Sequence, residues 1–129
     1  MKRIVCLVRL LALSMFVLSL GAGPVAATGT PGISGKTLKV KLNEWSLGFS
    51  RSKATKGNIK VEVTNVGRYP HNFVVRKKNT GETVYQSRTL KGNQVTKTSL
   101  NLPSGQYELY CSLPGHRNRG MLAALTVGG

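Results

Sequence analysis

Several residues and patterns that define large protein classes are scarce or missing in this sequence of 129 residues. It has no aspartate, so an enzyme built on a Cys-His nucleophile would lack the acid that often orients its base. No segment repeats apolar residues every three to four positions, which excludes a sustained amphipathic helix. We therefore expect neither a helical bundle nor a hydrolase of the Cys-His type.

The N-terminus has the pattern of an export signal. Basic residues precede an apolar run over 10–20, and small residues follow up to Ala27, which predicts a signal peptide over 1–27. Arg9 shortens the apolar segment to less than a bilayer requires, so cleavage after Ala27 is favoured over a retained anchor, which stays open. Cys6 leaves with the signal. We expect an exported protein, in the periplasm or on the outer face of the cell membrane.

The remaining chain is long enough for one domain. Residues 28–35 are rich in Gly, Pro and Thr and predict a flexible leader, and the domain spans 36–129. Cys111 is its only cysteine, so it cannot form an internal disulfide even though the compartment is oxidising. It could be buried and inert, paired with another chain, or bound to a metal.

Charge of one sign dominates the exported part. Without the signal, the chain has 16 Lys and Arg and four Glu, which gives a net charge of +12. Such a surface attracts anionic partners. The basic residues are scattered and no nucleic-acid motif accompanies them, so we expect no nucleic acid as partner. An acidic protein or an anionic membrane surface explains the charge equally well.

Alternating apolar residues predict strands. Leu38, Val40 and Leu42 alternate with polar residues, and residues 59–63 repeat the pattern. Seven to eight such strands, broken by Gly, Pro and Asn, predict an all-β fold, a two-sheet antiparallel sandwich. Tyr107 follows a Pro-Ser-Gly turn, where sandwich proteins often fasten a corner through a tyrosine hydroxyl.

The stretch 105–121, G-Q-Y-E-L-Y-C-S-L-P-G-H-R-N-R-G-M, gathers three soft donors. Cys111, His116 and Met121 are each separated by four residues, and His71 can arrive from an earlier strand at the same pole. One thiolate, two imidazoles and a weak axial thioether are the ligands of a blue copper site. Structural zinc normally takes four Cys or His ligands, and this chain retains three. The spacing predicts a mononuclear copper site.

These motifs resemble the cupredoxins, the small blue copper proteins that include plastocyanin, azurin, rusticyanin and auracyanin. The resemblance is carried by G-x-Y-x-x-Y-C-S-x-P-G-H over 105–116, by Met121, and by P-H-N over 70–72, and the loop spacing is most similar to rusticyanin and auracyanin. It implies a Greek-key sandwich. It also implies that Asn72 ties its loop to Ser112, and that the Asn72 amide points at the Cys111 sulfur.

The resemblance further implies a function. His116 would be the surface exit for electrons, inside an apolar docking patch with Leu113 and Pro114. Arg117 and Arg119 depart from the apolar residues often found there, and suggest a basic rim for an acidic redox donor and acceptor. We expect a monomeric one-electron carrier cycling Cu(II) and Cu(I), not an enzyme. The alternative is a protein that stores, buffers or delivers copper. Copper oxidases and nitrite reductases need further histidines, and none remain.

Overall fold

The computed structural model describes residues 37–129, and the predicted signal (1–27) and leader (28–35) lie outside the described residues. The described part contains nine strands: β1 (Leu38–Asn43), β2 (Ser46–Phe49), β3 (Lys53–Thr55), β4 (Gly57–Asn65), β5 (Val74–Lys77), β6 (Thr83–Gln86), β7 (Val95–Leu102), β8 (Gly105–Tyr110) and β9 (Leu122–Gly128). Within these residues no helix is long and apolar enough to span a membrane.

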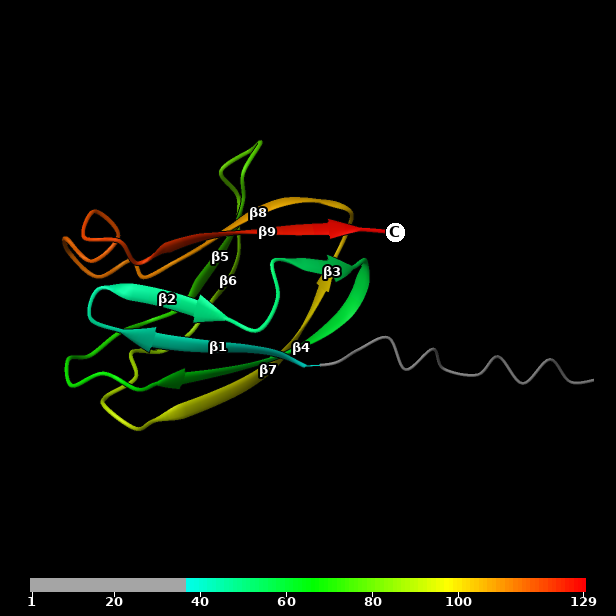
Figure 1. Cartoon of the computed structure of the whole chain (residues 1–129). Coiled ribbons are helices and arrows are strands. Elements are labelled where there is room, and N and C mark those ends of the chain that lie inside the picture. The colour runs from blue at the N-terminus through cyan, green and yellow to red at the C-terminus, as the bar shows by residue number, and fades with distance from the viewer. Residues whose placement is uncertain (1–36) are drawn as a thin grey trace, which may run out of the picture. The chain divides into compact units, whose positions relative to one another are not determined.

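The strands form two sheets packed face to face (Figure 1). One sheet has four strands in the order β2-β1-β4-β7, and the other has five in the order β3-β9-β8-β5-β6. Their inward side chains make one apolar core. Strands such as β1, in which buried and exposed residues alternate, contribute one face to this core. The predicted all-β sandwich is confirmed.

Two details differ from the expectation from sequence. Residues 37–129 form nine strands, because the apolar alternation after β1 folds back as a hairpin, in which Leu42 pairs with Leu47, and because the polar segment after it contributes β3. The sheets are mixed, because β1 pairs with β4, and β3 with β9, in parallel. Parallel and antiparallel neighbours impose the same alternation on a half-buried strand, so the sequence pattern does not distinguish them.

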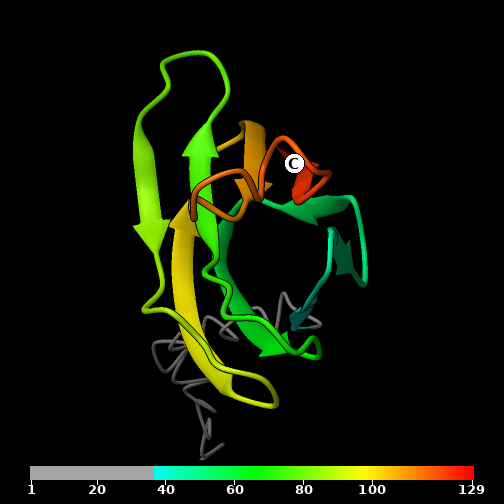
Figure 2. The same ribbon diagram turned by 90° about the vertical axis from the view of Figure 1, so that its left-hand side faces the viewer.

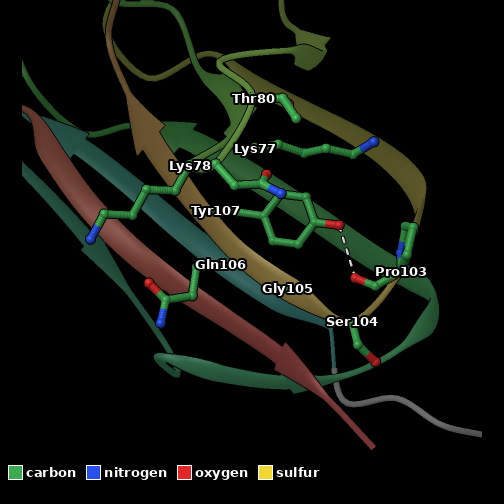
Figure 3. Close-up of a pocket in the computed structure, with 9 residues that line it drawn as sticks. Lys77, Lys78, Thr80, Pro103, Ser104, Gly105, Gln106 and Tyr107 are labelled. Carbon is green, nitrogen blue, oxygen red and sulfur yellow. Dashed lines mark hydrogen bonds between the residues drawn. The ribbon is translucent and has the colours of Figure 1, made fainter.

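Tyr107 fastens a corner as its position suggested. Its hydroxyl donates a hydrogen bond of 2.8 Å to the Pro103 carbonyl (Figure 3), and its side chain is buried. Lys77, Lys78 and the turn around Ser104 surround this ring in a shallow pocket. The bond joins the start of β8 to the turn before it, at the end of β8 opposite Cys111.

Three connections meet at the other end of the sandwich, on the left in Figure 1 and facing the viewer in Figure 2. They are the β1–β2 turn (44–45), the β4–β5 connection (66–73) and the β8–β9 loop (111–121), and we refer to this end as the site pole. His71 lies in the second connection and forms a bridge with Leu90, which precedes β7. The fold therefore brings both predicted histidine segments to one place.

Candidate metal centre

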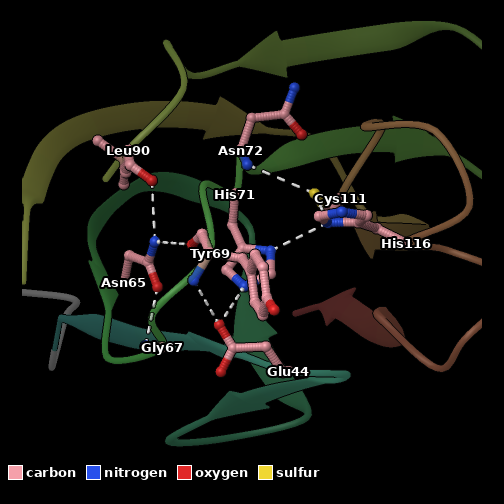
Figure 4. Close-up of polar contacts among 9 residues, drawn as sticks. All are labelled: Glu44, Asn65, Gly67, Tyr69, His71, Asn72, Leu90, Cys111 and His116. Carbon is pink, nitrogen blue, oxygen red and sulfur yellow. Dashed lines mark hydrogen bonds and ion pairs between the residues drawn. The ribbon is translucent and has the colours of Figure 1, made fainter. Parts of the chain in front are cut away.

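The structure brings His71, Cys111 and His116 together at the site pole, with their ligand atoms all within 4.8 Å of one another. The two Nδ1 atoms are 3.1 Å apart, and Cys111 Sγ is 3.5 Å from His116 Nδ1 (Figure 4). His71 and Cys111 are completely buried, whereas His116 keeps part of its surface exposed. One soft sulfur and two imidazole nitrogens thus face one small volume.

Met121 closes the loop that carries two of these donors. Its carbonyl accepts a 3.1 Å hydrogen bond from the Cys111 amide, and its own amide donates to the His116 carbonyl at 3.2 Å. Between them, Gly115 adopts a φ of +77°, a left-handed conformation that glycine adopts readily, so the chain can turn back within the loop. Met121 is completely buried. The predicted fourth donor therefore belongs to the same compact loop.

Asn72 links the two halves of the site. Its backbone amide donates to Cys111 Sγ at 3.4 Å. Its side chain makes two 2.8 Å hydrogen bonds with Ser112, donating to the hydroxyl and accepting from the backbone amide. These are the contacts that the family resemblance implied. They hold the Cys111 loop against the His71 connection and place a donor on the sulfur, where it stabilises negative charge.

Glu44, which the sequence analysis did not single out, holds the far side of His71. Its Oε1 accepts a 2.7 Å hydrogen bond from the Tyr69 amide and lies 3.4 Å from His71 Nε2 (Figure 4). The Tyr69 amide is the main cause that lowers the pKa of Glu44. A carboxylate behind a ligating histidine fixes the tautomer and the orientation of the ring. A side chain at Gly67 would displace this carboxylate from its present position.

Asn65 braces the connection that carries His71. Its buried side chain donates 2.8 Å hydrogen bonds to the carbonyls of Tyr69 and Leu90 and accepts one from Gly67. Leu90 in turn exchanges two backbone hydrogen bonds with His71. The ring of His71 is therefore held both through its backbone and through its Nε2 atom.

Trp45, next to Glu44 in the chain, contacts the other histidine. Its ring meets the His116 ring edge-on, with centroids 4.9 Å apart. Tyr69 stacks on Trp45 at 6.0 Å, and the Arg119 guanidinium lies 4.3 Å from the indole centroid. A Cβ at Gly120 would lie 2.7 Å from the Trp45 carbonyl, so the loop approaches the turn closely. The β1–β2 turn therefore contacts both imidazole rings, His71 through Glu44 and His116 through Trp45.

The two arginines of the loop lie in different environments. Arg117 bonds to Glu108 at 3.1 Å, and its guanidinium lies 5.1 Å from the Tyr110 centroid, alongside Arg76, which pairs with the same carboxylate. Arg119 has no carboxylate partner among the described residues. The pKa of His116 is lowered, mainly by burial of its ring. The charges of His71 and Arg119 lower it further. Arg117 is thus paired with a carboxylate, whereas Arg119 lies against the Trp45 ring and no carboxylate among the described residues neutralises its charge.

The donor set fits copper better than zinc. The described residues form one group of His, Cys, Asp or Glu able to hold a metal, and it offers three such ligands. Structural zinc normally takes four, whereas two imidazoles, one thiolate and a thioether suit copper.

The two apolar residues of the predicted docking patch beside His116 differ in exposure. Leu113 is half-buried against the core, and Pro114 is exposed.

Comparison with known proteins agrees with this chemistry. Residues 36–128 match the family model described as copper binding proteins, plastocyanin/azurin family. No curated protein sequence matches the chain. Similar solved structures include auracyanin from Roseiflexus castenholzii, with 18% identity, a TM-score of 0.58, and coverage of 74% of this chain and 98% of that one. Rusticyanin from Thiobacillus ferrooxidans has 15% identity and a TM-score of 0.63, with 73% and 77% covered.

These two likenesses establish the fold, and the family match establishes the cofactor. The family binds copper, and the matched residues include all three donors that converge at the site pole. Copper is therefore the metal of this site, and the chain belongs to the plastocyanin/azurin family of copper-binding proteins.

Proposed function

We propose that the protein is an exported one-electron carrier that moves electrons between larger redox proteins. Bound copper supplies the one-electron couple, Cu(II)/Cu(I). The observation that carries the proposal is the bracing of the donors: Glu44 and the Leu90 bridge hold His71, and Asn72 holds Cys111. Donors that are already fixed rearrange little when an electron arrives or leaves, which favours rapid transfer.

The same bracing favours a carrier over a copper store or delivery protein. Release of the metal would require the buried Cys111 to become accessible, and Asn72 ties its loop down by three hydrogen bonds. A carrier should retain copper through repeated oxidation and reduction when a Cu(I) chelator is present. Loss of copper to the chelator within the first reductions would instead favour delivery.

His116 is the proposed electron port, because it is the donor that reaches the surface. Leu113 and Pro114 flank it, and an acidic partner would meet Arg119. Hexacyanoferrate(III) serves as an anionic oxidant of the reduced, copper-loaded protein. Arg119→Gln should slow this oxidation at low salt more than at high salt. Arg117→Gln is the matched control, because it removes the same charge from a side chain that is already paired. Equal slowing of Arg119→Gln at both salt concentrations would refute electrostatic steering.

The direct test of the function is spectroscopic. Copper(II) added to the purified protein should give an intense blue thiolate band and the paramagnetic resonance spectrum of a type 1 site. Cys111→Ser should bind without the colour. A colourless wild-type protein would contradict the proposal, and a blue Cys111→Ser variant would show that the thiolate is assigned to the wrong residue.

A further inference from the structure

The outer face of the four-stranded sheet is covered with lysine. Strands β1, β4 and β7 lie side by side, and the outward positions of each alternate with core residues. Four lysines occupy these outward positions, and we refer to them as the lysine face: Lys39, Lys41, Lys60 and Lys97. Neighbouring strands are about 4.8 Å apart and alternate residues about 6.7 Å apart. Lys39 and Lys41 are alternate residues of β1, and the register places Glu62 between Lys39 and Lys97.

The positive charge of this face is not balanced. Its one carboxylate, Glu62, pairs with Lys97 at 3.1 Å, so the lysine face and Glu62 together carry a net charge of +3. Lys39, Lys41 and Lys60 have no carboxylate partner among the described residues. The other three glutamates are each engaged elsewhere with a histidine, lysine or arginine. The face therefore attracts an extended anionic surface.

The composition of the face does not match a protein–protein interface. The positions between the lysines are small and polar, including Asn58, Thr64 and Ser99, and Val95 at the edge is the one large apolar side chain exposed there. Cores of protein interfaces are enriched in aromatic residues and Arg, and depleted in Lys and Ser. The site pole, with Trp45 and Arg119, has the aromatic and Arg residues that are typical of interface cores. The lysine face has the Lys and Ser residues that are rare in them.

Lysine also suits a surface that carries many anionic groups better than it suits a single carboxylate in a fixed position. Arginine presents a fixed fork that matches one carboxylate, whereas lysine is a mobile point charge on a flexible stem. All four basic residues of the face are lysines. Shallow grooves separate them, one lined by Lys60, Lys97 and Ser99 and another by Lys39 and Lys41. Phosphate headgroups of a lipid layer can approach such a surface in any register.

We infer that the lysine face docks the protein on an anionic membrane. The site pole lies at one end of the sandwich (Figure 1), and the loop that carries His116 joins β8 and β9 of the other sheet, so a membrane against the lysine face leaves His116 uncovered. The carrier can thus rest on the lipid surface while its site pole faces a redox partner. The inference concerns a surface away from the donors and holds whether or not copper is bound.

Vesicle sedimentation tests this directly, with the protein purified after expression of the whole chain and detected by the fluorescence of Trp45. Wild type should sediment with vesicles of phosphatidylcholine and phosphatidylglycerol in equal parts, and not with phosphatidylcholine alone. Each lysine near an anionic surface contributes roughly fivefold to binding. The combined variant Lys39→Gln, Lys41→Gln, Lys60→Gln should therefore bind about a hundredfold more weakly.

The matched control removes three exposed lysines from other surfaces: Lys53→Gln, Lys78→Gln and Lys91→Gln. It has the same net charge as the first variant and should keep most of the binding. Equal losses in both variants would show that only total charge matters, and would overturn the assignment of the face. Failure of wild type to sediment with the anionic vesicles would also overturn it. Retention on immobilised polyglutamate without vesicle binding would assign the face to an acidic protein instead.

Discussion

Replacing Glu44 tests whether a residue that binds no metal controls the copper affinity. Both of its contacts use one oxygen: Oε1 accepts from the Tyr69 amide at 2.7 Å and lies 3.4 Å from His71 Nε2. Glu44→Gln can keep an acceptor there but loses the charge, whereas Glu44→Ala removes the acceptor. Loss of the partner behind a ligating histidine typically weakens metal binding 10- to 100-fold. We expect about tenfold for Gln and about a hundredfold for Ala, or about 1.4 and 2.7 kcal/mol.

The assay is a Cu(II) competition titration against a chelator, read by the blue absorption and by paramagnetic resonance. Denaturant unfolding of the copper-free variants measures separately how much the Tyr69 contact contributes to folding. Glu62→Gln is the control, because it removes a carboxylate that pairs with Lys97 on the outer face of a sheet. Wild-type affinity in Glu44→Ala, or an equal loss in Glu62→Gln, would refute the argument that His71 needs its carboxylate.

Three further changes probe other parts of the structure. Met121→Gln should retain copper but lower its reduction potential, because an amide oxygen favours Cu(II) more than a thioether does; voltammetry that finds an unchanged potential would show that Met121 is not axial. The Arg76 hydrogen bond, with further contributions from the Arg76 and Arg117 charges, lowers the pKa of Glu108 from 4.5. The ion pair therefore stabilises the folded protein at pH values above the ordinary pKa of a glutamate. This stability is lost as the pH falls through the lowered pKa of Glu108. Glu108→Gln should therefore cost about 1 kcal/mol at neutral pH and nothing in strong acid; a pH-independent loss in thermal unfolding would contradict the ion-pair explanation. Tyr107→Phe should cost about 1 kcal/mol in denaturant unfolding by removing the bond to Pro103. Tyr85→Phe is its control, because the Tyr85 hydroxyl forms no hydrogen bond with the described residues, and similar losses in both would exclude the corner bond as the cause.

The sequence predicted those parts of the site that depend on short spacing. Cys111, His116 and Met121 lie within eleven residues, and the turn between them leaves few arrangements for their donors. The sandwich followed from alternation, which burial of one strand face imposes directly. His71 could be added because the chain has no other histidine to offer.

The contacts behind the histidines could not be predicted in this way. Glu44 lies 27 residues before His71, and Trp45 simply continues the apolar alternation of the first strand. Their role depends on where the β1–β2 hairpin turns and on the parallel pairing of β1 with β4. The alternation does not encode either feature. Two glycines were the available signals, because Gly67 and Gly120 leave room for the Glu44 carboxylate and the Trp45 carbonyl.

The β1–β2 turn also limits how far this copper site can be moved between scaffolds. A designer who transplants residues 111–121 into another sandwich carries over three of the four donors and the backbone bonds that close the loop. The recipient would still lack Glu44 behind one imidazole and Trp45 against the other. Its histidines would be free to rotate, and the graft would bind copper with mixed geometries. The smallest portable unit is therefore the loop together with a hairpin that lies more than sixty residues earlier in the chain.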